Sequence, residues 1–135
     1  MKSRDFTLTE LRPQILSAKI FPGMSSEEFF QNKTLRPIIK LQNDLLIAVF
    51  RNYIKKNKNS FYDIILEKRL EYIANAIHKD IKFRNSLKGI ILGQFTLEEY
   101  ETYIQNSSAL NKRMMNLVIQ RLQDQVQLLE PNFAY

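Results

Sequence analysis

The fold is set by one long stretch in the first half of the chain, TLRPIIKLQNDLLIAVFRNYIKKNKN, which spans residues 34–59. Thr34 belongs to the residue types that cap helix N-termini, and Pro37 is tolerated in a first helical turn, where its missing amide hydrogen would have no partner. On a helical wheel at ~100° per residue, the charged side chains form a narrow stripe and apolar side chains occupy most of the remaining surface. A helix of this kind must be packed on several sides. The stretch therefore predicts a long central helix over about residues 35–58.

The rest of the chain continues the helical pattern, with few residues that interrupt helices. Three glycines and four prolines occur in 135 residues. After Ser60, which we expect to cap the next helix, apolar residues recur at steps of three and four: Leu66, Leu70, Ile73, Ile77 and Ile81. No glycine or proline stands near Asp80, so the sequence leaves open whether the helix of residues 60–79 continues past Asp80 or restarts there.

A capping box and a pair of serines complete the assignment of helices. In TLEE, residues 96–99, threonine and glutamate stand at the spacing at which each side chain caps the other's backbone amide. Ser107 or Ser108 then begins a last helix that runs to Leu129. We therefore expect an all-α protein, a single-domain bundle of five or six helices over residues 1–135.

The residue types exclude several kinds of chemistry. The chain has no cysteine, which excludes disulfides, zinc–thiolate sites and a thiol nucleophile. Its single histidine, His78, follows Glu71 and Asn75 on one helix face, whereas a di-metal site in a bundle needs two Glu-x-x-His pairs. No G-x-S-x-G elbow or glycine-rich phosphate loop occurs. We therefore expect no metal, no cofactor and no catalytic residues, and interpret His78 as a surface or boundary residue.

Hydropathy argues against a membrane segment. No stretch approaches the ~20 apolar residues that a membrane span requires. The polar start, MKSRD, is not typical of a signal peptide. We therefore expect a cytoplasmic protein.

The net charge gives the one compositional indication about partners. Twenty Lys and Arg against fourteen Asp and Glu leave +6, and the excess is concentrated in residues 35–59 and 81–95. These segments supply a candidate basic surface for phosphate groups: Arg36, Lys40, Arg51, Lys55, Lys82, Arg84 and Lys88. Residues 96–107 carry three acids and no base, so the alternative is that the basic stripe pairs with acidic helices.

One segment has the rhythm of a helix-turn-helix motif, TLEEYETYIQNSSALNKRMM, residues 96–115. Lys112 and Arg113 would be the DNA contacts on this interpretation. The motif is disfavoured because polar residues stand where it needs a small residue, a turn glycine and apolar anchors: Glu101, Gln105, Asn106 and Asn111.

The last helix carries apolar residues at the spacing of a coiled-coil seam: Met115, Ile119, Leu122, Val126 and Leu129. Two interpretations fit so short a seam. The helix either dimerises with a second copy or packs within its own bundle, and short seams favour packing within the bundle.

Three stretches together resemble a small, uncharacterised bacterial family of about this length: EEFFQNKTLRPIIKLQNDLLIAVF, FRNSLKGIILGQFTLEEY and NKRMMNLVIQRLQDQ. Its members often bear the automatic label "glyoxalase", and the resemblance implies no catalytic residues. Glyoxalase I-type enzymes use a β-rich, metal-binding fold, and glyoxalase II-type enzymes use a histidine-rich motif. A helical chain with one histidine matches neither pattern.

Three function classes follow from the sequence, in decreasing order. The first is a protein-binding adaptor or regulatory module, with self-association as one form of it. The second is nucleic-acid binding through the basic stripe. The third is an enzyme that matches the glyoxalase label.

Overall fold

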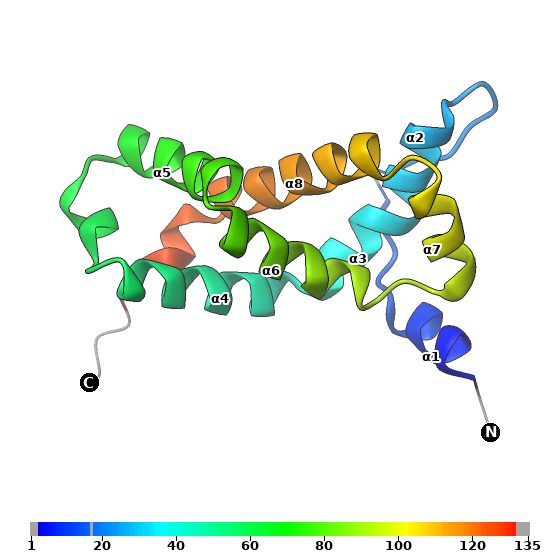
Figure 1. Ribbon diagram of the computed structural model, residues 1–135, viewed down its shortest axis with the longest axis horizontal. Helices are drawn as coiled ribbons and strands as arrows, with labels where there is room; N and C mark the ends of the chain where they lie inside the picture. The colour runs from blue at the N-terminus through cyan, green and yellow to red at the C-terminus, as the bar shows by residue number, and fades with distance from the viewer. Residues whose placement is uncertain (1–2, 17, 132–135) are drawn as a thin grey trace.

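The computed structural model describes residues 3–16 and 18–131, and this part of the chain is helical without a strand. Figure 1 shows an elongated body at one end of which α1, α2 and α7 lie together. The α-helices are α1 (Arg4–Leu11), α2 (Ser26–Phe30), α3 (Arg36–Leu41), α4 (Asn43–Lys56), α5 (Leu66–Lys79), α6 (Ile81–Leu92), α7 (Leu97–Ile104) and α8 (Ser107–Asp124). The all-α fold class is confirmed. No helix in the described residues is both long enough and apolar enough to cross a membrane.

The central helix over residues 35–58 is wrong as a single element. A π-helical turn, Gln31–Leu35, leads into α3, and Gln42 then separates α3 from α4. Gln42 has φ −88° and ψ 6°, which tilts the backbone without a glycine or proline to announce it. The interruption is local, because the Gln42 amide still donates to Ile38 and its carbonyl still accepts from Leu46. After α4, Lys58 and Asn59 both take positive φ and reverse the chain.

Two capping expectations are also corrected. Thr34 lies inside the π-helical turn and is buried, so it caps nothing. Ser60 begins a 3₁₀ turn, Ser60–Asp63, and α5 starts only at Leu66. The question left open at Asp80 has a definite answer: Asp80 ends α5 and caps α6, because its carboxylate accepts from the Phe83 amide at 3.1 Å. Aspartate is one of the preferred N-cap residues.

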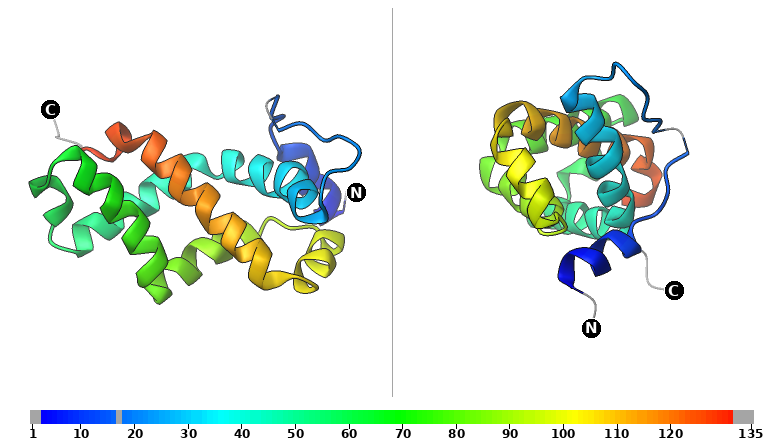
Figure 2. Two further views of the ribbon diagram at one scale, coloured as in Figure 1. Left: turned by 90° about the horizontal axis from the view of Figure 1, so that it is seen from above. Right: turned by 90° about the vertical axis from the view of Figure 1, so that its right-hand side faces the viewer.

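The core lies around α8, which Figure 2 shows crossing the middle of the molecule between α3–α4 and α5–α6. Phe50 of α4 is fully buried, and its ring meets the rings of Tyr53, Phe61, Tyr72 and Phe83 at 5.7–6.3 Å. Aromatic contacts of this kind dominate core energetics because each ring buries a large apolar area. This cluster joins α4, α5 and α6 into one body.

The seam of the last helix serves this core. Met115, Ile119, Leu122 and Leu129 are buried, and Val126 packs against them partly buried. The helix itself ends at Asp124, earlier than expected, and a 3₁₀ turn, Val126–Leu129, carries the last two seam residues. The five side chains therefore pack within their own bundle and leave no apolar seam for a second copy.

Candidate functional site

The end of the molecule formed by α1 and α7 carries the most elaborate polar structure. The predicted capping box at the start of α7 is confirmed: the Glu99 amide donates to the Thr96 hydroxyl at 3.2 Å, and the Thr96 amide donates to a Glu99 carboxylate oxygen at 2.8 Å. The box satisfies two backbone donors that a helix start otherwise leaves without partners. It fixes where α7 begins.

Glu99 is also the centre of an ion-pair cluster that the sequence does not reveal. The Arg12 guanidinium donates to both Glu99 carboxylate oxygens, at 2.6 and 2.7 Å, and the Thr34 hydroxyl donates to one of them at 3.1 Å. The Arg12 and Glu99 side chains are only 9% and 17% exposed. We call Arg12, Thr34, Thr96 and Glu99 the Arg12–Glu99 cluster. It ties the chain after α1, the π-helical turn and α7 to one point.

The cluster lowers the pKa of the Glu99 carboxyl. Burial alone would raise this pKa, because a buried charge is poorly solvated. Hydrogen bonds from Arg12, the Thr96 amide and Thr34 outweigh burial, together with the positive charge of Arg12, and the pKa falls below its ordinary value of 4.5. The carboxylate is therefore ionised in the folded protein at neutral pH, and its function is to hold α7 in place.

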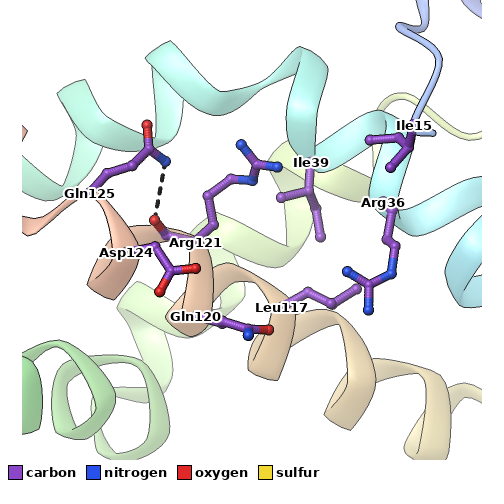
Figure 3. Close-up of a pocket in the computed structure, with 8 residues that line it drawn as sticks. All are labelled: Ile15, Arg36, Ile39, Leu117, Gln120, Arg121, Asp124 and Gln125. Carbon is purple, nitrogen blue, oxygen red and sulfur yellow. Dashed lines mark hydrogen bonds between the residues drawn. The ribbon is translucent and has the colours of Figure 1, made fainter. Parts of the chain in front are cut away.

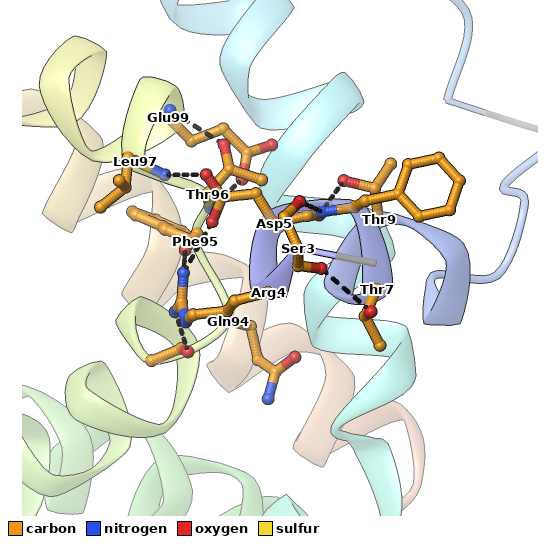
Figure 4. Close-up of polar contacts among 12 residues, drawn as sticks. Ser3, Arg4, Asp5, Thr7, Thr9, Gln94, Phe95, Thr96, Leu97 and Glu99 are labelled. Atoms are coloured by element: carbon orange, nitrogen blue, oxygen red, sulfur yellow. Dashed lines mark hydrogen bonds and ion pairs between the residues drawn. The ribbon is translucent and has the colours of Figure 1, made fainter. Parts of the chain in front are cut away.

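Helix α1 strengthens the same end through polar contacts, which Figure 4 shows. The Arg4 guanidinium donates to the carbonyl oxygens of Gly93 and Phe95, at 3.0 and 2.9 Å. The Asp5 carboxylate accepts from the Leu97 amide, the first residue of α7, at 3.1 Å. The loop before α7 is thus held by both the start of the chain and the cluster.

The outer face of α7 is apolar and exposed. Leu97, Tyr100 and Ile104 follow one another at steps of three and four, which places them on one helix face, and they are 70%, 48% and 54% exposed. We call these three residues the α7 stripe. Beside it, between α1 and α7, lies a hollow of about 370 Å³ whose apolar wall includes Leu92 and Phe95. The inner face of the helix is fixed by Glu99 and by buried Tyr103, so the stripe is presented on a held support.

Acidic side chains border the stripe. Glu98 and Glu101 are exposed, and neither forms an ion pair with a residue that the structure describes. Glu101 lies about 70° from the centre of the stripe around the helix and Glu98 lies farther round on the same side. The surface therefore combines an apolar stripe with a negative edge, although the whole chain carries +6.

The seven basic residues singled out in the sequence do not form one surface. The stripe expected on the central helix is divided at Gln42, with Arg36 and Lys40 on α3 and with Arg51 and Lys55 on α4. Lys82, Arg84 and Lys88 all lie on α6. The seven are Arg36, Lys40, Arg51, Lys55, Lys82, Arg84 and Lys88, and none forms an ion pair within residues 3–16 and 18–131. Pairing of the stripe with acidic helices is therefore not observed in this part of the chain.

Arg36 lines a groove between α3 and α8, shown in Figure 3. The groove has a volume of about 270 Å³, with Ile39 and Leu117 on its apolar side and Arg121 and Asp124 on its polar side. The Arg36 Nε donates to the Asn32 side chain at 3.0 Å, and Arg121 donates to Asn43 at 3.3 Å. The side chains of this groove thus serve partly to join neighbouring helices, and Asp124 offsets part of its positive charge.

His78 lies exposed near the end of α5. In the described residues, no group of three or more His, Cys, Asp or Glu side chains stands close enough together to hold a metal ion. Comparison of the sequence with protein-family models gives no match, and neither curated proteins nor solved structures match the chain.

Proposed function

We propose that this chain is a protein-binding module that docks a basic amphipathic helix of a partner protein on the α7 stripe. One observation carries the proposal: three large apolar side chains stand exposed on one face of a helix whose other face is fixed by a partly buried ion pair. Single exposed apolar residues are ordinary on protein surfaces, but a contiguous row on one helix face is typical of a docking site.

The held position of α7 supports docking. A surface that is already ordered loses little conformational freedom when a partner binds, so more of the contact energy appears as affinity. The capping box, the Arg12–Glu99 cluster and the Arg4 and Asp5 contacts fix α7 before any partner arrives. Burial of two such aliphatic side chains contributes roughly 1.5–3 kcal/mol each, so their loss from an interface lowers affinity by more than tenfold.

The negative edge supports the choice of partner. Glu98 and Glu101 lie on one side of the stripe without ion pairs, so lysine or arginine residues that flank a partner's apolar face find complementary charge there. A second copy of this chain fits less well. In a two-fold pairing of α7 with α7, the same acidic edges come together and repel each other.

The test uses two helical peptides with identical leucine positions, one with lysine and the other with glutamate at every polar position. Titration calorimetry is expected to show that the full-length protein binds the lysine peptide more tightly, although its overall charge of +6 favours the glutamate peptide. Leu97→Ser with Ile104→Ser is expected to weaken binding at least tenfold, since two buried aliphatic contacts are lost. The matched control, Leu66→Ser with Ile81→Ser, changes two comparably exposed residues elsewhere and leaves affinity unchanged.

Two outcomes contradict the proposal. One is equal or tighter binding of the glutamate peptide, and the other is an equal effect of the stripe variant and its control. Light scattering at two protein concentrations tests the remaining occupant. A dimer that Leu97→Ser with Ile104→Ser dissolves would show that a second copy, rather than a basic partner, covers the stripe.

A further inference from the structure

A hollow between α6 and α8 gathers cationic side chains from elements that are distant in the sequence. It has a volume of about 380 Å³ and is lined by Arg84 and Lys88 of α6, by Lys112 of α8 and by His78 at the end of α5. Asparagine side chains fill much of the remaining wall, at positions 85, 111 and 116. We call this the cationic hollow.

No acidic side chain offsets this charge. None of the residues that line the cationic hollow is Asp or Glu, and Lys88 and Lys112 form no ion pair with any described residue. Arg84 makes a single printed contact across the helix junction, donating to the His78 carbonyl at 3.3 Å. That contact positions the guanidinium without neutralising it.

The neighbouring grooves along α8 differ in this respect. In the groove between α3 and α8, Asp124 stands with Arg36 and Arg121, as Figure 3 shows. In the hollow between α2 and α8, Arg113 pairs with Glu27 at 3.4 Å. Of these three depressions, which share the helix α8, the cationic hollow alone has positive charge without an acid among its lining residues.

Like charges that converge on one depression repel each other unless an anion lies among them. Phosphate oxygens accept hydrogen bonds from guanidinium and ammonium groups, and asparagine amides supply further neutral donors. We infer that the cationic hollow binds a phosphate group, with Arg84, Lys88 and Lys112 as its charged contacts. The phosphate belongs either to a free nucleotide or to the backbone of a nucleic-acid strand, since both present the same chemistry to these side chains.

The experiment measures binding of two probes to the full-length protein at about 50 mM salt, where phosphate contacts are strong. One probe is a fluorescent ADP and the other is a labelled single-stranded RNA of about 12 nucleotides, a length within the site size of common single-strand binders. Binding of RNA alone assigns the phosphate to a nucleic-acid backbone, and binding of ADP alone assigns it to a nucleotide. Binding of neither probe would overturn the inference.

The variant Lys88→Gln with Lys112→Gln removes two of the three charged contacts, and we expect it to weaken the bound probe about tenfold and to lower the RNA salt slope by about 2. The matched control is Lys55→Gln with Lys56→Gln, which removes the same charge from two exposed residues at the end of α4. An equal loss in the control would overturn the inference, because it would show that net charge rather than the hollow binds the probe. Leu97→Ser with Ile104→Ser is expected to leave phosphate binding unchanged, which separates this site from the α7 stripe.

Discussion

The two ends of this molecule are held by different forces. Around Phe50, α4, α5 and α6 meet through packed aromatic rings with little polar contribution. At the other end, α1 contributes no buried residue and is joined to the loop before α7 by hydrogen bonds and by the Arg12–Glu99 cluster. Apolar packing is strong but non-directional, whereas hydrogen-bonded charge pairs fix one orientation. The comparison indicates that the aromatic body supplies stability and that the polar end supplies the position of α7.

The polar end is also the less complete of the two. Arg12 Nε and Gln94 Oε1 are buried without a hydrogen-bond partner in the described part of the chain. Unsatisfied buried groups cost free energy in the closed state, which lowers the cost of opening this end. We therefore expect the end that carries α1 and α7 to open separately from the aromatic body.

The largest expected effect is in the aromatic body. Phe50→Ala removes a fully buried ring with four aromatic neighbours and is expected to lower the free energy of unfolding by about 4 kcal/mol. Urea denaturation followed by circular dichroism measures the change. The control, Phe21→Ala, removes an exposed ring and is expected to stay within about 0.5 kcal/mol. Similar losses in both variants would contradict the role given to the body.

The next effect is at the polar end. Arg12→Ala leaves the Glu99 carboxylate partly buried without its ion pair and is expected to cost about 3 kcal/mol of unfolding free energy. Lys68→Ala is the matched control, because Lys68 and Glu71 form an ion pair in which both side chains are 61% exposed. That change is expected to cost less than about 0.5 kcal/mol. A loss for Arg12→Ala as small as the control's would show that the cluster does not fix this end.

Acid is expected to break the same end without any substitution. Because the folded-state pKa of Glu99 lies below its ordinary value of 4.5, the ionised carboxylate stabilises the fold above that pH. The contribution falls as the pH is lowered from about 4.5 through the folded-state pKa. Denaturation at a series of pH values measures this loss in the wild type. Glu99→Gln is expected to show a flatter dependence, and an unchanged slope would argue against the cluster as its source.

The smallest effect concerns the polar contact inside the aromatic body. The Tyr53 hydroxyl donates to the Asp80 carboxylate at 3.1 Å, and burial together with this carboxylate raises the pKa of Tyr53 to about 12. Stability from this group is present below pH 10 and is lost as the pH rises towards 12. Asp80→Asn keeps a good helix cap and removes the charge, so the pKa of Tyr53 should fall while staying above 10 through burial.

Absorbance titration of the tyrosines measures this change, with Tyr53→Phe to identify the late ionisation. If Asp80→Asn leaves that ionisation where it is in the wild type, the carboxylate is not a cause of the raised pKa.

Sequence patterns predicted what depends on local chemistry. Apolar periodicity indicated helices, and the Thr96–Glu99 spacing predicted a capping box that the structure contains. The break at Gln42 carries no local signal, because tertiary packing rather than a glycine or proline produces it. Thr34 has the composition of a cap, but its hydroxyl instead meets a carboxylate 65 residues away.

The candidate sites depend on long-range contacts in the same way. Leu97, Tyr100 and Ile104 have the spacing of a helix face, but the sequence does not say whether that face turns inward or outward. Arg84 and Lys88 were singled out for their charge, and Lys112 was considered only as a DNA contact. Their convergence requires α6 and α8 to lie side by side, which no spacing along the chain shows.

Amide hydrogen exchange on the wild type and Arg12→Ala tests most directly the claim that the cluster holds α7 independently of the body. In Arg12→Ala, protection of the α7 amides is expected to fall about 100-fold, the equivalent of roughly 3 kcal/mol, while protection in α4 stays within about threefold. An equal fall in both helices would contradict the claim, because α7 would then open only when the whole molecule unfolds. Unchanged protection in α7 would contradict it as well.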